Sequence, residues 1–207
     1  MTDLASADLG PSDLERLYKA PHPFVLKKCI DHLDVHARSF IALSPFCVVS
    51  SSDKEGRLDV SPRGGSPGFI HVADDHTLLM PDRPGNNRLD TLRNVTGGTG
   101  RLGMMFMIPG FEDVLRVNGR AGLTDDPALL AGFEDFGKLP ITLVRIHVEE
   151  VFFHCPKAIM RSGLWEAERQ IPRDTLPTLT EMVSEQLGYP RAVVDEKAVE
   201  ASLRDTL

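Results

Sequence analysis

A segment with the sequence SPRGGSPG combines residue types that bind anions. An arginine guanidinium donates paired hydrogen bonds to a phosphate or carboxylate, and glycines let backbone N–H groups come close to such a ligand. The candidate binding residues in this segment are Ser61, Arg63, Gly64, Gly65 and Ser66. Their chemistry predicts a cradle for a phosphorylated or planar anionic group.

A second segment, PDRPGNNR, stands directly before a predicted short helix. Exposed N–H groups at a helix N-terminus, together with two flanking arginines, suit a phosphate. The candidates in this segment are Pro81, Arg83, Gly85, Asn86, Asn87 and Arg88. They predict a phosphate contact where the loop enters the helix.

A third segment, HCPKAIMRSGLW, carries the only tryptophan of the chain and is expected to be an exposed late loop. Tryptophan and arginine side chains can flank a flat aromatic ring. The candidates are Arg161, Ser162 and Trp165. Taken together, the three segments predict a bulky ligand with a phosphate and a flat ring, such as flavin mononucleotide (FMN).

Each segment also has a plainer interpretation. The arginines of the first two segments could pair with Asp59, Asp82 or Asp90 inside ordinary turns, and the third segment could form a dimer contact. The region from Arg57 to Arg120 holds eight arginines, no lysine and seven acidic residues, a local net charge of +1 in a chain of net charge −7. Such a preference for arginine favours bidentate contacts with planar or phosphorylated groups. The alternative is a general bias of the chain, in which arginine outnumbers lysine 16 to 7.

Two other chemistries are not expected. The run from Gly64 to Gly68 matches G-x-S-x-G, but the residue after the serine is Pro67, which has no N–H for an oxyanion hole. The sequence has no HExxH, CxxC or P-loop motif, so no metal site is predicted.

Composition limits the class of protein. The chain has 207 residues, of which 42% are hydrophobic and 26% charged, a composition typical of soluble domains. A net charge of −7 argues against a nucleic-acid partner, and no apolar run reaches membrane-spanning length. The N-terminus lacks a signal-peptide pattern, and the three cysteines are too few and too far apart for a disulfide framework. These observations predict a cytoplasmic protein.

The candidate segments must be positioned by short strands. Alternating or continuous apolar residues separated by turns predict strands over 46–49, 58–61, 69–72, 77–80, 102–108, 114–122 and 144–153, with 102–108 buried. Hairpins without regular βαβ alternation indicate a mainly β protein, an antiparallel barrel or sandwich.

Helices are predicted at the ends and corners. The capping box Ser12–Glu15 predicts a first helix that runs to about Lys19 and ends before Pro21 and Pro23. Apolar residues at helical spacing predict one over 33–42, with Leu33, Ala37, Phe40 and Ile41 on one face. Further helices are expected over 88–95, 126–136 and 178–188 and in the last fifteen residues.

The order of these parts resembles the FMN-binding split barrels related to pyridoxamine 5′-phosphate oxidase, in particular a bacterial subgroup of flavoproteins of that type. The resemblance covers roughly Leu43 to Trp165. It is carried by SPRGGSPGF from Ser61, PDRPGNNRLDTLRN from Pro81, LRVNGRA from Leu115 and FHCPKAIMRSGLW from Phe153. It implies a six-stranded antiparallel Greek-key split barrel that acts as a homodimer, with FMN between the subunits.

The resemblance also assigns expected roles within the site. Residues from Ser61 to Ser66 would meet the flavin, with Arg63 the preferred contact, and the loop from Arg83 to Arg88 would hold the phosphate. Gly-Asn-Asn-Arg replaces the Ser/Thr, Arg and Lys pattern that is usual in this loop. Arg161, Ser162 and Trp165 would close the site, either from the same subunit or from the neighbouring one. The Arg-x-His signature of true pyridoxamine phosphate oxidases is missing near the C-terminus, so vitamin B6 oxidation is not expected.

Three regions are expected: an N-terminal helical segment over 1–42 that packs on the barrel, the split-barrel domain over 43–165, and a C-terminal helical tail over 166–207. The implied function is that of an FMN-dependent oxidoreductase with a small-molecule substrate or electron donor and no catalytic side chain of its own. The alternatives are a flavin carrier or redox sensor without turnover, or a binder of a related ligand such as a deazaflavin or haem.

Overall fold

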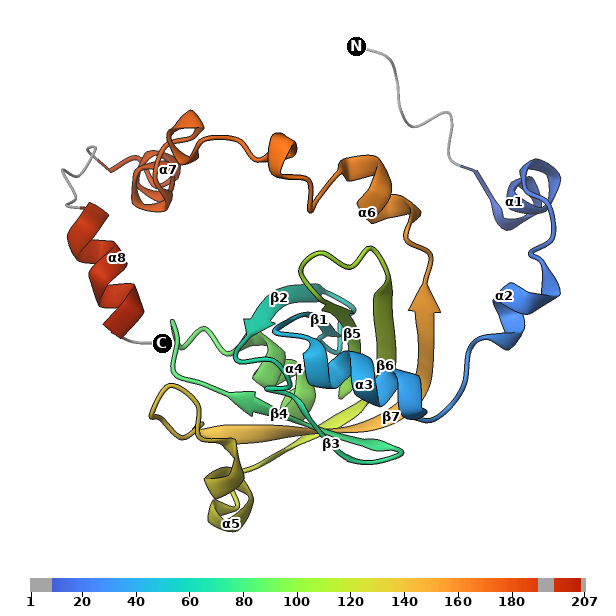
Figure 1. Ribbon diagram of the computed structural model, residues 1–207, viewed down its shortest axis with the longest axis horizontal. Coiled ribbons are helices and arrows are strands. Elements are labelled where there is room, and N and C mark those ends of the chain that lie inside the picture. Colours follow the sequence, from blue (N-terminus) through green and yellow to red (C-terminus); the bar gives the residue numbers. More distant parts are fainter. Residues whose placement is uncertain (1–8, 190–195, 206–207) are drawn as a thin grey trace.

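The computed structural model describes residues 9–189 and 196–205. Its centre is a single antiparallel sheet that wraps around an apolar core (Figure 1). The described strands are β1 (Phe46–Ser52), β2 (Leu58–Gly64), β3 (His71–Asp74), β4 (Thr77–Asp82), β5 (Arg101–Met107), β6 (Val114–Thr124) and β7 (Thr142–His154). The strand order across the sheet is β2-β1-β5-β6-β7-β4-β3.

This arrangement confirms the predicted antiparallel split barrel with flanking helices. The expected number of six strands is wrong, because the sheet has seven. One edge of the sheet is β3, a short strand that pairs with β4 alone and contains an irregularity between Val72 and Asp74.

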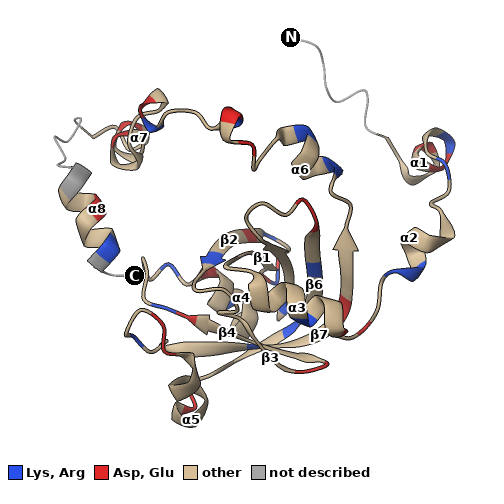
Figure 2. Cartoon of the chain, viewed as in Figure 1, with Lys and Arg blue, Asp and Glu red and all other residues tan. Residues whose placement is uncertain are grey.

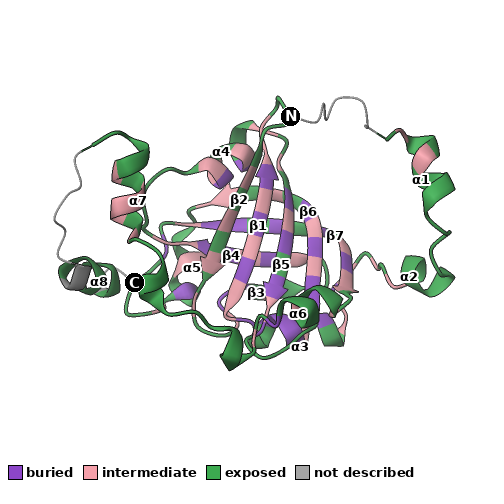
Figure 3. Ribbon diagram, turned by 90° about the horizontal axis from the view of Figure 1, so that it is seen from above, coloured by how far each residue is buried: buried purple, intermediate pink, exposed green. Residues whose placement is uncertain are grey.

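The inner face of β4 and β7 is apolar, because every second residue points into the barrel. Leu78 and Met80 on β4 are fully buried and pair across the ladder with Ile146 and Val144 on β7. Figure 3 shows this alternation of buried and less buried residues along the strands. These rungs form one side of the core.

Strand β2 has the reverse distribution of side chains, with polar residues on its inner face and apolar residues on its outer face. Its half-buried inner positions are Asp59, Ser61 and Arg63, whereas Leu58 and Val60 on the outer face are 79% and 66% exposed. The inner residues pair with Ser51, Val49 and Cys47 of β1. The barrel is therefore polar inside along one edge strand, where the sheet begins.

Strands β6 and β7 form the longest ladder, and it contains a bulge between Asn118 and Gly119. A Cβ atom at Gly119 would overlap the carbonyl oxygen of His147 on the opposite strand. Glycine is required here because the two backbones come too close for any side chain.

Two helices pack on the barrel. Helix α3 (Val35–Leu43) begins after Asp34, whose carboxylate accepts a hydrogen bond from the Ala37 N–H at 2.8 Å. Ala37, Phe40 and Ile41 are buried as predicted, and Leu33 is buried too, but it lies before the helix, which begins at Val35 rather than at residue 33. Helix α4 (Asp90–Gly97) lies against β1, β2, β5 and β6 and buries Thr91 and Val95.

The other helices lie towards the chain ends and in the long connections. They are α1 (Pro11–Leu17), α2 (Pro23–Lys27), α5 (Pro127–Leu130), α6 (Lys157–Ser162), α7 (Leu179–Gln186) and α8 (Glu196–Asp205), with single 3-10 turns at 131–133, 167–169 and 173–175. Figure 1 shows α1 and α2 on one arm and α6, α7 and α8 on another, both extending from the barrel. Helices α1, α2, α6 and α7 bury no residue in the single chain.

Several element predictions need correction. The first helix is capped at Gly10, whose N–H donates to Asp13, and it ends at Leu17 rather than near Lys19. Pro23 begins α2 instead of ending a helix, because proline suits the first helical position. The segment after Pro156 is helix α6 and not a loop. The capping box at Thr178 is confirmed at the start of α7.

The predicted buried strand over 102–108 is only half right. Strand β5 alternates, with Leu102, Met104 and Phe106 buried, while Met105 on the other face is 38% exposed. An apolar run does not distinguish a strand covered on both faces from one covered on a single face.

Cys29, Cys47 and Cys155 are free thiols, and burial raises the pKa of the Cys47 thiol to about 12. Within the described ranges, no helix combines the length and apolar character needed to cross a bilayer. The division of the chain at residues 42 and 165 stays a prediction.

Candidate functional site

A cleft of about 770 Å³ opens between the two ends of the sheet. One side is the inner face of β2, and the other is the end of β4 with Ile141 and Thr142 of the chain entering β7. The loop over 83–89 and the first turn of α4 close a third side. The cleft thus lies where the barrel is split and where the inner face changes from apolar to polar.

Arg63 links β2 to helix α4 inside the cleft. Its guanidinium donates to the Ser61 hydroxyl, to the Pro62 carbonyl at 2.9 Å and to the Thr91 hydroxyl at 3.1 Å. Thr91 is 2% exposed and donates in turn to the Asp59 carboxylate at 2.8 Å. This chain of hydrogen bonds fixes the guanidinium against the cleft wall, with its charge retained in the site.

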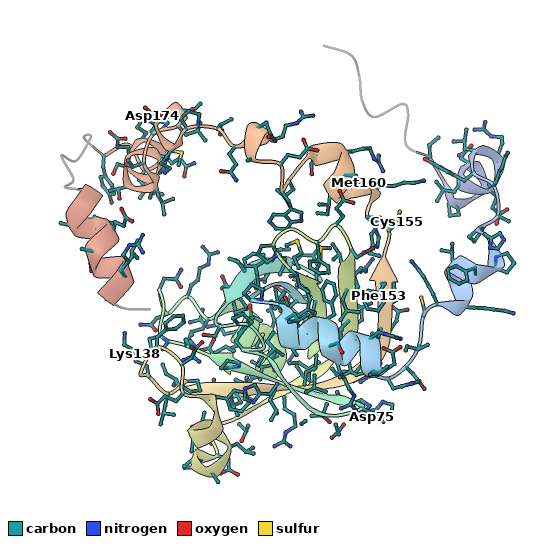
Figure 4. The ribbon with its side chains drawn as sticks, viewed as in Figure 1. Asp75, Lys138, Phe153, Cys155, Met160 and Asp174 are labelled. Carbon is teal, nitrogen blue, oxygen red and sulfur yellow. The ribbon has the colours of Figure 1, made fainter. Side chains whose placement is uncertain are left out.

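Arg83 holds a different part of the molecule in place. Its guanidinium donates to the backbone carbonyls of Phe133 at 3.0 Å and Lys138 at 3.1 Å, and it lies 3.8 Å from the Asp135 carboxylate. Figure 4 labels Lys138 in this connection between α5 and β7. Two of the three guanidinium nitrogens of Arg83 therefore anchor the 133–138 loop beside the cleft.

The loop before α4 has a strained backbone. Asn87 and Leu89 have φ angles of 56° and 60°, in the left-handed region, where non-glycine residues are uncommon. The Asn86 side chain accepts from the Arg88 N–H at 3.0 Å, and the Arg88 guanidinium forms an ion pair with Asp90. The predicted short helix starts at Asp90, so Arg88 lies before it rather than in its first turn.

Asp82 is the last residue of β4, and its half-buried carboxyl lines the cleft. Burial raises the pKa of Asp82, and the nearby charge of Arg63 opposes this by lowering it. Figure 2 shows acidic and basic residues next to each other where β4 ends. The cleft holds both signs of charge in equal number: Asp59, Asp82 and Asp90 against Arg63, Arg83 and Arg88.

Most of the residues predicted from the first two segments line the cleft: Ser61, Arg63, Gly64, Pro81, Arg83, Gly85, Asn86, Asn87 and Arg88. Gly65 and Ser66 lie outside it. The Ser66 hydroxyl donates to Asp135 at 2.8 Å, and a Cβ at Gly65 would come within 2.7 Å of the Phe69 Cβ. These two residues hold the turn after β2 in place.

The third segment lies elsewhere in the same chain. Trp165 lines a separate pocket of about 390 Å³ between α6 and the β5–β6 turn, and its Nε1–H donates to the Phe111 carbonyl at 2.7 Å. The Arg161 Nε–H donates to the Lys157 carbonyl and the Ser162 hydroxyl to that of Ile159, both within α6. The structure does not bring Arg161, Ser162 or Trp165 to the cleft of their own chain.

Sequence reasoning missed five polar cleft residues as site candidates: Asp59, Asp82, Asp90, Thr91 and Thr142. Thr142 lies an even number of residues from Val144, Ile146 and Val148. Alternate strand residues share a face, so this spacing could have placed Thr142 on the inner face. Asp59 and Asp82 were considered only as partners for arginines, and nothing local marks Thr91 as buried.

A split barrel with a charged cleft at its opening is the class of protein that the fold and the site define. A family model described as pyridoxamine 5′-phosphate oxidase matches residues 33–155, which is more than half of the chain. The chain therefore belongs to the pyridoxamine 5′-phosphate oxidase family. At the level of the family, this membership supports a flavin-related oxidoreductase.

Solved structures with a similar fold come from several bacteria. HupZ from Group A Streptococcus is 18% identical with a TM-score of 0.46, over 58% of this chain and 92% of that chain. A protein from Clostridium acetobutylicum related to general stress protein 26 (pyridoxinephosphate oxidase family) is 8% identical with a TM-score of 0.44, over 58% and 86%. The FAD binding protein from Mycobacterium smegmatis is 14% identical with a TM-score of 0.40, over 60% and 97%.

A search of curated proteins finds no match to the sequence.

Proposed function

We propose that the protein is an FMN-dependent oxidoreductase acting on a small-molecule substrate or electron donor. The observation that carries the proposal is the cleft at the split of the barrel, which gathers the arginines of two separate sequence segments, in a chain that belongs to this family.

The residues of the cleft fit FMN in size and chemistry. A volume of about 770 Å³ lies in the usual range for small-molecule and cofactor pockets. Arg83 and Thr142 line the cleft, and the Arg83 Nε and the Thr142 hydroxyl are buried without a hydrogen-bond partner in the described part of the chain. Buried polar atoms without partners are rare in proteins, so their position here supports a polar ligand.

Each part of the cleft has a role in this proposal. Arg63 places a fixed positive charge next to the ligand, held by Thr91 and Ser61. Asn86, Asn87 and Arg88 would bind the phosphate on the loop before α4, and Arg88 can exchange its exposed ion pair with Asp90 for a phosphate contact. When bound, the isoalloxazine ring would supply hydride or single-electron chemistry. The residues of the cleft would bind and orient the ring.

A homodimer with the cofactor site at the subunit interface is part of the proposal. Leu58 and Val60 form an exposed apolar strip on the outer face of β2, and Met105 on β5 continues this face. Exposed apolar patches of this kind mark protein interfaces. The partner subunit could then bring Arg161, Ser162 and Trp165 to the cleft. A cytoplasmic location stays a prediction from the sequence.

The alternatives differ in what the bound ligand does. A carrier or redox sensor would hold FMN without turnover, and a binder of a deazaflavin or of haem would use the same cleft for another planar anion. The polar cleft supports all three, and family membership favours the flavin oxidoreductase.

The test is anaerobic reduction of the FMN-loaded protein with NADH, NADPH or dithionite, followed by reoxidation with oxygen or quinones. We expect a nicotinamide donor to bleach the flavin bands and an acceptor to restore them in repeated cycles. Reduction by dithionite alone would favour the carrier or sensor. Failure to bind FMN, with a deazaflavin or haem bound instead, would favour the third alternative.

A further inference from the structure

The β4–β7 ladder ends in a polar pair. Asp82 is the cross-strand partner of Thr142 and follows the apolar rungs Leu78–Ile146 and Met80–Val144. Because strand residues alternate between faces, Asp82 and Thr142 lie on the same inner face as those rungs. The core of the barrel thus changes, at its last cross-strand pair, from apolar side chains to Asp82 and Thr142, two polar residues that line the cleft.

Two buried hydrogen-bonding atoms belong to residues at this end of the cleft and lack a partner among the described residues. The Thr142 Oγ1 and the Arg83 Nε are buried and unpartnered within the described ranges. The remaining nitrogens of Arg83 are bound to the 133–138 loop, so its Nε–H cannot turn away without breaking those contacts. An unsatisfied buried polar group destabilises the protein, and a ligand hydrogen bond removes that penalty.

Asp82 differs from the other charged groups of the cleft. Asp59 accepts from Thr91, Asp90 pairs with Arg88, and Arg63 and Arg83 are hydrogen-bonded as described above. The Asp82 carboxyl has no side-chain hydrogen bond to any residue that the structure describes, and only its backbone carbonyl accepts one, from the Ile141 N–H. It is therefore an acceptor available to a ligand.

We propose that Asp82, Thr142 and the Nε–H of Arg83 form a subsite that binds the imide edge of a heteroaromatic ring, an N–H flanked by carbonyl groups. The carboxylate accepts from the ring N–H, while the hydroxyl and the guanidinium Nε–H donate to the carbonyl oxygens. This inference rests on the proposed function in that it takes the cleft to be the ligand site. It adds the orientation of the ring and the residues that select it.

The charge of the cleft favours a neutral imide over other ligands in this subsite. An ammonium group would face Arg63 and Arg83, and a phosphate would face the Asp82 carboxylate. The imide edge is neutral and carries one donor between two acceptors. It therefore complements the Asp82 acceptor and the donors of Thr142 and Arg83, and no two like charges meet. Flavins and uracil nucleotides both carry such an edge.

The test compares two ligands that differ at one atom. Lumiflavin and 3-methyllumiflavin are titrated into ligand-free full-length protein, and binding is followed by flavin fluorescence. Methylation removes the imide N–H, so we expect lumiflavin to bind at least about tenfold more tightly. Equal affinities in the wild-type protein would overturn the subsite, and this comparison needs no variant.

Variants assign the effect to residues. Asp82→Ala and Thr142→Val should each bring the affinity ratio of the two flavins towards one, whereas an unchanged ratio in both would overturn the assignment. Thr77→Val is the matched control, because Thr77 lies at the opposite end of the same ladder and outside the cleft. Ligand-free Thr142→Val should melt no lower than the wild-type protein, since it loses an unpartnered hydroxyl.

A third probe separates the subsite from the proposed function. UMP shares the imide edge but not the isoalloxazine ring. Binding of UMP in place of FMN, abolished by Asp82→Ala, would support the subsite and contradict the flavin function. Binding of FMN with no preference between the two lumiflavins would support the flavin function and overturn the subsite. Binding of none of these probes would overturn both.

Discussion

At the scale of single residues, the chemistry of the cleft depends on side chains that the fold has already oriented. Arg63 is held by three hydrogen bonds from its guanidinium. The side chain is therefore ordered before a ligand binds, so binding loses less side-chain conformational entropy and the affinity is higher. The same contacts mean that Arg63 also connects β2 to α4, so a substitution there acts on both ligand and wall.

Replacing Arg63 by alanine should lower the affinity for FMN by on the order of tenfold or more, because a charge-assisted contact is lost. The measurement is the flavin-to-protein ratio after gel filtration at a fixed FMN concentration. Arg57→Ala is the control, since Arg57 is an exposed arginine paired with Asp53 and Glu55 outside the cleft. Unchanged flavin content in Arg63→Ala would remove this residue from the site.

Asp82 should make the ligand-free protein less stable as the pH rises. Its pKa is raised in the folded state by burial, despite Arg63, from an ordinary value of 3.8. The folded state then binds more protons than the unfolded state above pH 3.8, so the free energy of unfolding falls until the pH passes the raised pKa. Asp82→Asn removes this dependence.

The check is urea unfolding of the wild-type protein and of Asp82→Asn at several pH values from acid to neutral. We expect the stability advantage of the variant to grow as the pH rises and then to level off above the folded-state pKa of Asp82. An advantage that is constant with pH, or that shrinks as the pH rises, would contradict the sign of this shift.

At the scale of elements, local patterns identify strands better than they identify which faces are covered. The seven predicted strand segments all correspond to strands or parts of them, apart from the start of the segment over 69–72, where only 71 and 72 are in β3. The local pattern does not predict that the outer face of β2 is the apolar one, because apolar residues are expected inside whereas Leu58 and Val60 point outwards. A strand that is apolar outside and polar inside depends on the partners that the other strands provide.

Helix α6 shows the opposite difficulty. Its six residues are too few for a periodic apolar pattern, and its stop signal, Gly163 at φ 58°, suits a loop equally well. Short helices of this kind depend on tertiary context, so sequence alone does not distinguish them from turns.

The β6 bulge makes a specific prediction. Gly119→Ala should destabilise the protein by at least about 2 kcal/mol, because the new Cβ would overlap the His147 carbonyl across the ladder. Gly122→Ala on the same strand is the matched control, since nothing lies near its added Cβ, and its stability should change by less than about 0.5 kcal/mol. Urea unfolding measures both; equal effects of the two substitutions would contradict the importance of the bulge.

At the scale of the whole molecule, the single chain leaves much apolar surface exposed. Both arms carry exposed hydrophobic residues, among them Tyr18 and Phe24, each 71% exposed, and Ile171, 69% exposed. Together with the outer face of β2, this surface supports the proposed homodimer. A dimer would also explain why Trp165 lies in a pocket apart from the cleft of its own chain.

Val60→Asp should convert the proposed dimer to a monomer, because the charge would be buried in the interface without a partner. Sedimentation velocity at several protein concentrations measures the change. Val35→Asp on α3 is the control, since Val35 is 67% exposed at the first turn of a helix that packs its other face on the barrel. A monomeric wild-type protein, or a Val60→Asp variant that stays dimeric, would contradict the proposed interface.

The candidate site was predictable in part. The segments around Arg63 and Arg88 were found because arginine, glycine and asparagine cluster locally, and the fold brings both to one cleft. Thr142 and Asp82 meet only through strand pairing across sixty positions of the chain, which no local pattern encodes. The chemistry of Trp165 and the family resemblance both predicted it in the same site, but in the single chain it lies elsewhere.

The most direct test of the central claim is the visible absorption spectrum of the purified protein, with mass spectrometry of the chromophore that heating releases. The account predicts the two bands of oxidised flavin and a released compound with the mass of FMN. A protein that is colourless as purified, and that retains no flavin after incubation with FMN and gel filtration, would contradict it.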